Sequence, residues 1–192
     1  TKGVYELGSV FKTFTLAAAL NYGVVDMDTK FENLEKKIWC AGNPISEYDY
    51  DIPSSLTAEE ILIRSGNIGS VRIAQKVGAE KFKIFLENLG IINKIDFDIE
   101  EVGTPENIVF GKCKLATSSF GHGISTTLLQ LVKAYAIISN GGFLVEPTLI
   151  INKKIRDKKK IQLINKGISK KINLTLRKVV STKEGTAGFA NI

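Results

Sequence analysis

A continuous run of helix-forming residues near the start of the chain constrains the fold more than any other stretch. Residues 10–20 (VFKTFTLAAAL) contain neither proline nor glycine. The tripeptide at 21–23 (NYG) follows as an end signal. We therefore predict a helix over residues 10–20, with Ser9 at or near its first turn.

Ser9 and Lys12 lie three positions apart, so a helix would place the hydroxyl and the amine on one face. A serine hydroxyl is a poor nucleophile unless a neighbouring base takes its proton. Lysine is such a base only when uncharged, and burial among apolar groups such as Phe11, Phe14 and Leu16 favours the neutral form. The helix N-terminus also favours negative charge developing on the oxygen. S-x-x-K alone remains a weak pattern, because ordinary amphipathic helices contain it too.

Composition indicates one globular domain or a large piece of one. The chain has 192 residues, of which 44% are apolar and 24% charged, and a net charge of +6. Residues 153–178 hold eleven Lys or Arg and one acid, Asp157. Such a stretch can bind nucleic acid, but no aromatic residue follows position 151 until Phe189. We predict a solvated basic surface and no nucleic-acid partner.

Few residues are available for metal binding or targeting. Cys40 and Cys113 could pair, although sequence leaves this open. The single histidine, His122, and the absence of Cys-x-x-Cys exclude a His-based or paired-cysteine metal site, and we expect no cofactor. The chain has no apolar run of about 18 residues to span a membrane and no signal peptide. It starts at Thr1 without methionine, so we expect a piece of a longer protein.

The rest of the chain is predicted to be mostly helical. Thr57 and Glu60 form a capping box for a short helix that ends at residue 63. Apolar spacing and terminal glycines predict further helices over 68–77, 80–89, 126 or 127 to 138, and 169–180. We expect 24–53 to be irregular with perhaps one short strand, 91–120 to be mostly loop, 143–151 to be extended, and 153–160 to form an exposed hairpin.

The polar turn Ser65-Gly66-Asn67 between two predicted helices is the second chemical element. Turns favour these residues for local hydrogen bonding, so alone the tripeptide indicates little. Beside Ser9 and Lys12 it gains a role: Ser65 could relay a proton between a lysine and a leaving amine. Asn67 could orient a peptide carbonyl and hold the lysine. S-x-x-K followed by S-x-N is far more specific than either pattern alone.

With these motifs the chain resembles the transpeptidase domain of penicillin-binding proteins, whose signature is S-x-x-K, serine-x-asparagine and K-T-G. Residues 1–15 are similar to the stretch around that family's nucleophile, with Leu7 where proline is usual. Residues 57–78 match the segment around the second motif, with Gly66 where serine or aspartate is more frequent. Residues 120–147 look like its glycine-rich element and following helix. The chain is most similar to the class B, division-type enzymes.

The resemblance implies an α+β fold, with residues 1–192 forming a mostly helical fragment of the transpeptidase fold shared with serine β-lactamases. Much of the core antiparallel sheet would be missing. It also implies acyl transfer, in which Ser9 attacks a D-alanyl-D-alanine peptide with Lys12 as base, and Ser65 and Asn67 assist. A neighbouring stem peptide would accept the acyl group, and β-lactams would trap the acyl-enzyme.

The same resemblance implies partners and a location for the parent protein. Its partners would be peptidoglycan stem peptides, division proteins and a lipid-linked glycan polymerase. The parent would be anchored in the inner membrane, with this domain in the periplasm.

The third motif departs from the family pattern. Residues 183–187 (KEGTA) carry Glu184 where K-T-G has threonine. We interpret this stretch as a helix end leading into a glycine-threonine turn, and expect the K-T-G strand beyond Ile192. In the family that strand supplies one oxyanion-hole amide, and losing one such donor costs a factor of about 10² to 10³ in turnover. We therefore expect an enzymatic parent and a 192-residue piece that is not a competent enzyme.

Three alternatives remain open at the level of sequence. Water could be the acyl acceptor, as in a serine β-lactamase or D,D-carboxypeptidase. The domain could also be a non-catalytic β-lactam sensor or a division scaffold.

His122 is expected to be a loop residue and not a triad histidine, because Leu7 and Phe11 replace the glycines of G-x-S-x-G around Ser9.

Overall fold

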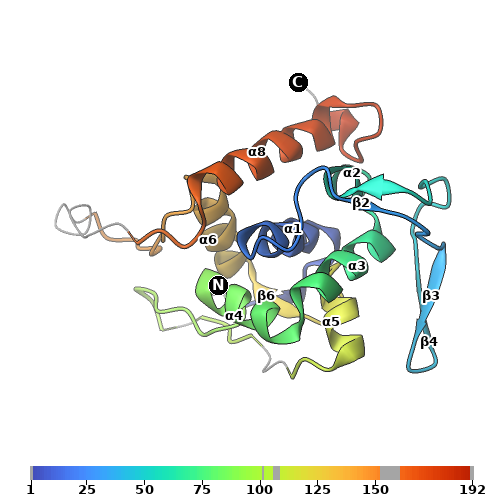
Figure 1. Cartoon of the computed structure of the whole chain (residues 1–192). Coiled ribbons are helices and arrows are strands. Elements are labelled where there is room, and N and C mark those ends of the chain that lie inside the picture. The colour runs from blue at the N-terminus through green and yellow to red at the C-terminus, as the bar shows by residue number, and fades with distance from the viewer. Residues whose placement is uncertain (1, 101, 106–108, 152–160, 191–192) are drawn as a thin grey trace.

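A single buried helix lies at the centre of the molecule. The computed structural model describes residues 2–100, 102–105, 109–151 and 161–190. Within this part of the chain, α1 (Lys12–Asn21) contacts α2 (Ala58–Ile63), α3 (Asn67–Val77), α4 (Ala79–Leu89) and α8 (Lys166–Ser181), as Figure 1 shows. Every residue of α1 from Lys12 to Leu20 is buried. A helix that is covered on all sides is expected to be rich in apolar residues, as most of this run is.

The main helices predicted from the sequence are confirmed. Thr57 caps α2 through a complete capping box, and Thr127 does the same for α6 (Leu128–Ser139). Gly78 and Gly90 follow α3 and α4 with φ of 81° and 75°, conformations that favour glycine. α8 begins at Lys166, earlier than predicted, because Asn165 caps it by accepting a hydrogen bond from Gly167 N–H.

The first turn of the predicted N-terminal helix is tighter than an α-helix. Gly8–Phe11 forms a 3₁₀ turn, η1, and α1 starts only at Lys12. Another short 3₁₀ turn, η2, covers Gly188–Ala190.

The described strands form three two-stranded antiparallel sheets, which confirms the α+β class. β1 (Val4–Glu6) pairs with β6 (Ser125–Thr127), and β2 (Lys30–Phe31) pairs with β5 (Leu56–Thr57). β3 (Lys37–Cys40) pairs with β4 (Asn43–Ser46) in a hairpin that projects from the helices at the right of Figure 1.

The prediction for residues 24–53 was wrong in its strand content, since β2, β3 and β4 all fall there. A two-residue turn closes the β3–β4 hairpin, and Ala41 and Gly42 have φ of 47° and 81°. Such turns need positive φ at both positions. Alanine rarely adopts that conformation, so Ala41-Gly42 gave no recognisable turn signal.

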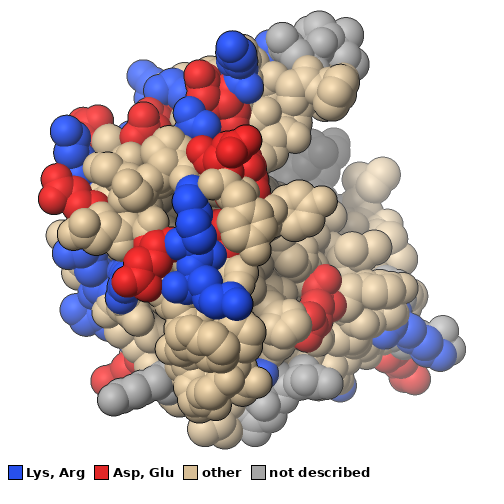
Figure 2. All heavy atoms as spheres, turned by 90° about the vertical axis from the view of Figure 1, so that its right-hand side faces the viewer, with Lys and Arg blue, Asp and Glu red and all other residues tan. Residues whose placement is uncertain are grey.

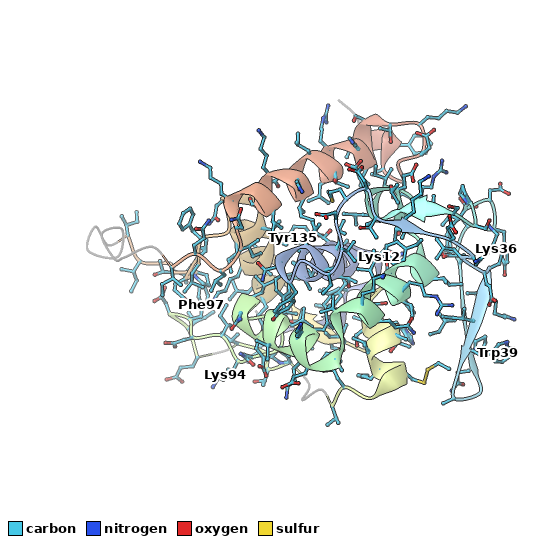
Figure 3. The ribbon with its side chains drawn as sticks, in the orientation of Figure 1. Lys12, Lys36, Trp39, Lys94, Phe97 and Tyr135 are labelled. Atoms are coloured by element: carbon cyan, nitrogen blue, oxygen red, sulfur yellow. A yellow bond between two sulfur atoms is a disulfide. The ribbon has the colours of Figure 1, made fainter. Side chains whose placement is uncertain are left out.

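The described residues between 91 and 120 are mostly loop, as predicted, but the sequence did not predict α5 (Lys112–Ser118). This helix follows Gly111 and has no side-chain cap, so the usual start signal is missing. Cys113 on α5 forms a disulfide with Cys40 on β3, which settles the open question of their pairing. The bridge ties the hairpin to the helical body (Figure 3).

The C-terminal part includes the turn that the sequence predicted at 183–187. Residues 143–151 contain no regular strand, and Phe143 makes one antiparallel bridge with Gln162. The predicted hairpin at 153–160 lies outside the described residues. Residues 183–187 form a turn after α8, in which the Gly185 N–H donates to Thr182 O and the Ala187 N–H donates to Val179 O. This stretch is thus a helix end leading into a turn, as interpreted from the sequence.

Acidic and basic side chains are interspersed on the face shown in Figure 2.

Within the described ranges, no helix is long and apolar enough to cross a membrane. No three His, Cys, Asp or Glu side chains of these ranges lie close enough together to hold a metal ion.

Candidate active site

Ser9 stands on an exposed 3₁₀ turn between β1 and the central helix. Contacts to the backbone on either side fix this turn. Gly8 N–H donates to Gly121 O at 3.1 Å, and the Tyr135 hydroxyl donates to Val10 O at 2.7 Å. Among the described residues the Ser9 hydroxyl makes no hydrogen bond, so it is open to a reaction partner.

Lys12 brings an amine into the interior directly beneath this turn. Its side chain is buried, with 2% of the residue exposed. Nζ donates to Ser65 Oγ at 2.8 Å and also to Ser65 O. Burial lowers the pKa of Lys12 from 10.5 to about 8, while the negative charge of Glu47 acts in the opposite direction. Figure 3 shows Lys12 between α1 and α3. A fraction of this amine is therefore uncharged near neutral pH.

Ser65 lies in a strained backbone conformation. Its φ is +56°, which is uncommon for a residue with a side chain. The turn is held at its start, where the Gly66 N–H donates to Ile61 O at 2.9 Å. Strain of this kind tends to persist at functional sites, where surrounding contacts enforce it. Here it points both oxygens of Ser65 at the Lys12 amine.

Asn67 is the first residue of α3, and its side chain is turned towards the hairpin. Asn67 Nδ2 donates to Ser46 O at 2.9 Å. Its backbone N–H donates to Glu47 Oε2 at 2.7 Å, and the Ile68 N–H donates to Glu47 Oε1 at 2.9 Å. The side-chain amide of Asn67 thus contacts Ser46, whereas the sequence had suggested that it would contact Lys12.

The structure therefore brings the predicted residues into one region. Lys12 and Ser65 are in direct contact, Ser9 lies one turn before Lys12, and Asn67 ends the turn that Ser65 begins. Sequence reasoning missed Glu47. One signal could have prompted a search for this carboxylate. Gly66 at the N-cap of α3 has no side chain to accept a hydrogen bond, so the first backbone N–H groups of that helix need an acceptor from elsewhere in the chain.

A cavity of about 550 Å³ lies between the hairpin and α5. The disulfide, Pro44, Ser46, Phe120 and His122 contribute to its wall. His122 is an exposed loop residue, as predicted. Its Nδ1 lies 3.2 Å from Glu6 Oε2 and its ring stacks on Phe120. Because Ser46 also holds Asn67, the cavity adjoins the turn at 65–67.

Comparison with known proteins decides the family. The sequence profile described as the penicillin binding protein transpeptidase domain matches residues 1–191. The chain belongs to this family. The family predicted from S-x-x-K and S-x-N is thus confirmed.

Several curated relatives of this penicillin-binding protein domain are named peptidoglycan D,D-transpeptidases. A probable peptidoglycan D,D-transpeptidase FtsI of Caulobacter vibrioides is 31% identical over 140 residues, 72% of this chain and 23% of that protein. An FtsI homolog of Mesostigma viride is 29% identical, over 94% of this chain and 32% of its own length. The chain thus spans about a quarter to a third of these relatives.

Solved structures show the same fold. A transpeptidase domain of Burkholderia pseudomallei penicillin-binding protein 3 superposes with a TM-score of 0.89 at 24% identity. The match covers 97% of this chain and 56% of that one. A Burkholderia ambifaria structure described as a peptidoglycan glycosyltransferase gives the same TM-score and identity, over 97% and 59% of the two chains.

Proposed function

We propose that the protein of which this chain forms part is a peptidoglycan D,D-transpeptidase that uses Ser9 as its nucleophile. The observation that carries the proposal is the buried amine of Lys12, which lies one turn beyond Ser9. This amine contacts Ser65, and burial lowers its pKa to about 8. Such a residue can accept a proton close to neutral pH. Relatives named as D,D-transpeptidases support the same activity.

In the proposed first step, the Ser9 oxygen forms a bond to the carbonyl carbon of the penultimate D-alanine. Neutral Lys12 takes the hydroxyl proton. The bond to the terminal D-alanine nitrogen then breaks, and Ser65 relays a proton from Lys12 to that leaving amine. Asn67 orients the peptide. Backbone N–H groups near the start of the helix, including that of Ser9, stabilise the oxyanion.

In the second step, the amine of a neighbouring stem peptide attacks the ester carbonyl. The carbon–oxygen bond to Ser9 breaks, the proton of the incoming amine returns to Ser9 through Lys12, and a cross-link remains. A β-lactam would form the same ester with Ser9, but its ring-opened product stays attached.

We further propose that the parent acts at the division septum, anchored in the inner membrane with this domain in the periplasm. The FtsI names of the relatives and the residues around Ser9 support this setting. Division proteins and a lipid-linked glycan polymerase would be its partners.

A fluorescent penicillin tests the nucleophile. We expect mass spectrometry to find the adduct on Ser9 in the wild type and in the control Ser54→Ala, which changes another exposed serine. Ser9→Ala should carry no adduct. Adduct formation in Ser9→Ala would contradict the proposal. The same assay tests whether this chain reacts more slowly than a complete relative, as we expect because its 192 residues contain no K-T-G sequence.

Product analysis with the complete parent separates transpeptidase from hydrolase. With a D-alanyl-D-alanine peptide and an acceptor amine, a transpeptidase joins the two and releases D-alanine. A carboxypeptidase releases the free acid and forms no cross-link.

A further inference from the structure

Glu47 is a buried carboxylate whose role lies outside the motifs discussed so far. Only 4% of the residue is exposed, and no cation lies within 4 Å of it in the described part of the chain. A buried charge is costly unless it is hydrogen-bonded. Glu47 meets this need through the backbone N–H groups of Asn67 and Ile68, at the positive end of α3.

The segment that carries Glu47 is itself firmly placed. It follows β4, and the Glu47 N–H donates to Lys36 O at 3.0 Å next to β3. Its neighbour Ser46 accepts a hydrogen bond from the side chain of Asn67. Two consecutive residues of the hairpin therefore hold both the backbone and the side chain of Asn67.

The hydrogen bonds that Asn67 donates to Ser46 and Glu47 affect Lys12 through the turn at 65–67. Ser65 keeps its strained φ of +56° only while both ends of the turn are fixed. Ile61 fixes the start through Gly66, and Glu47 fixes the end through Asn67. Both oxygens of Ser65 accept from Lys12, so displacement of the turn would remove the partners of the amine.

We propose that Glu47 is a positioning residue, whose carboxylate fixes the turn at 65–67 against Lys12 and places a buried negative charge near the amine. Its part in the reaction rests on the proposed function. The charge favours protonated Lys12 and opposes the effect of burial. Glu47 therefore restrains how readily Lys12 becomes a neutral base.

Several other charged groups on the elements around Lys12 have partners of their own. Glu59 on α2 pairs with Lys178 on α8, and Glu60 accepts from Thr57. Tyr135 on α6 is uncharged near neutral pH, because burial raises its pKa. Further contacts join Arg72 to Gln75, Lys76 to Phe31, Lys81 to Tyr22, Lys83 to Glu87, Lys133 to Glu146, and Lys171 to Asp26.

The test compares Glu47→Gln with the matched control Glu60→Gln. Both residues accept backbone N–H groups near the start of a helix, but Glu60 lies outside the site. Nuclear magnetic resonance of the Lys12 side chain follows its titration directly. We expect the Lys12 midpoint in Glu47→Gln to fall by roughly half a pH unit or more. Glu60→Gln should titrate like the wild type.

The pH profile of Ser9 acylation gives the second readout. In Glu47→Gln its acidic limb should move to lower pH, and the maximum rate should fall as the turn loosens. A purely structural residue would lower the rate at every pH without moving the limb. An unchanged Lys12 midpoint in folded Glu47→Gln, or an equal shift in Glu60→Gln, overturns the inference.

If Glu47→Gln does not fold, Glu47→Asp tests the same idea. The shorter carboxylate keeps the charge but cannot reach both amides, so hydrogen exchange at the amides of residues 67 and 68 should quicken about tenfold or more. The Lys12 midpoint should stay near its wild-type value. Unchanged exchange at both amides overturns the inference. Titration and exchange need no substrate, so a shifted midpoint together with no Ser9 acylation in the complete parent protein would refute only the proposed function.

Discussion

Lys12 is costly to the folded state because it must be desolvated. Its pKa is about 8 in the folded protein and near 10.5 when exposed, so between these values the unfolded chain binds the proton that the folded one has released. Stability therefore rises with pH across this window and is flat below it. One pKa step corresponds to about 1.4 kcal/mol, which makes the whole change on the order of 3 kcal/mol.

Replacing Lys12 by methionine removes this dependence. We expect the free energy of unfolding of Lys12→Met to exceed that of the wild type most at pH 8 and below. The excess should shrink by about 3 kcal/mol as the pH approaches 10.5. Urea denaturation at several pH values measures the difference. Lys133→Met is the control, since Lys133 is a partly buried lysine that pairs with Glu146. An excess that stays constant with pH would contradict the burial argument.

Gly121 keeps the Ser9 turn in place through close backbone approach. Its φ is +82°, and a Cβ there would lie 2.0 Å from Gly8 O. Gly121→Ala must therefore push the turn away as well as strain its own backbone. We expect a loss of roughly 2–4 kcal/mol of stability, together with slower acylation of Ser9.

Gly23→Ala is the matched control for that change. Gly23 also has a positive φ, of 64°, but open space around it. Its substitution should cost only the conformational strain, about 1–2 kcal/mol, and leave acylation unchanged. Equal effects of the two variants on acylation would show that the approach to Gly8 is unimportant. Thermal melts and penicillin labelling measure both.

At the level of elements, the sequence predicts best where start and stop signals are local. The capping boxes of α2 and α6 and the glycines after α3 and α4 gave the helices to within a residue or two. The 3₁₀ start of α1 was not predictable, because its tightness depends on Gly121 and Tyr135, which are distant in sequence.

Elements that depend on remote contacts escaped prediction. The β3–β4 hairpin turns at Ala41-Gly42, and α5 lacks a cap. A disulfide between them stabilises both. Four site residues could be proposed from the spacing within two motifs: Ser9 and Lys12 from S-x-x-K, and Ser65 and Asn67 from S-x-N. Glu47 could not, because its link to Asn67 runs between elements and has no fixed spacing.

The disulfide should matter both for stability and for the site. Cys40 and Cys113 are 73 positions apart, and closing a long loop typically contributes about 2–4 kcal/mol. We expect the double variant Cys40→Ser, Cys113→Ser to lose about that much in urea denaturation. Because the hairpin also holds Asn67 through Ser46, acylation of Ser9 should slow.

Reduction gives the control for that double variant. Dithiothreitol should destabilise the wild type to the level of the variant and leave the variant unaffected. If the double variant were as stable as the oxidised wild type, the disulfide would contribute nothing to stability and the prediction would be wrong.

At the scale of the molecule, the proposed site joins a central helix to a peripheral hairpin. Lys12 belongs to α1, which is covered by helices, as Figure 1 shows. The residues that hold Asn67 belong to a hairpin at the edge of the molecule, where Trp39 and Tyr48 are 66% and 95% exposed. The base is thus fixed by the core, whereas the turn that contacts it depends on a peripheral hairpin.

Native-state hydrogen exchange should reveal this difference. Amides in the second half of α1, such as those of Ala18 and Ala19, are fully buried and should exchange only when the whole molecule unfolds. Their exchange free energy should then fall with urea as steeply as global stability does. Amides of the β3–β4 hairpin should exchange through local opening, with little dependence on urea. If hairpin amides exchanged as slowly as those of α1, the turn at 65–67 would be held as rigidly as the lysine it contacts.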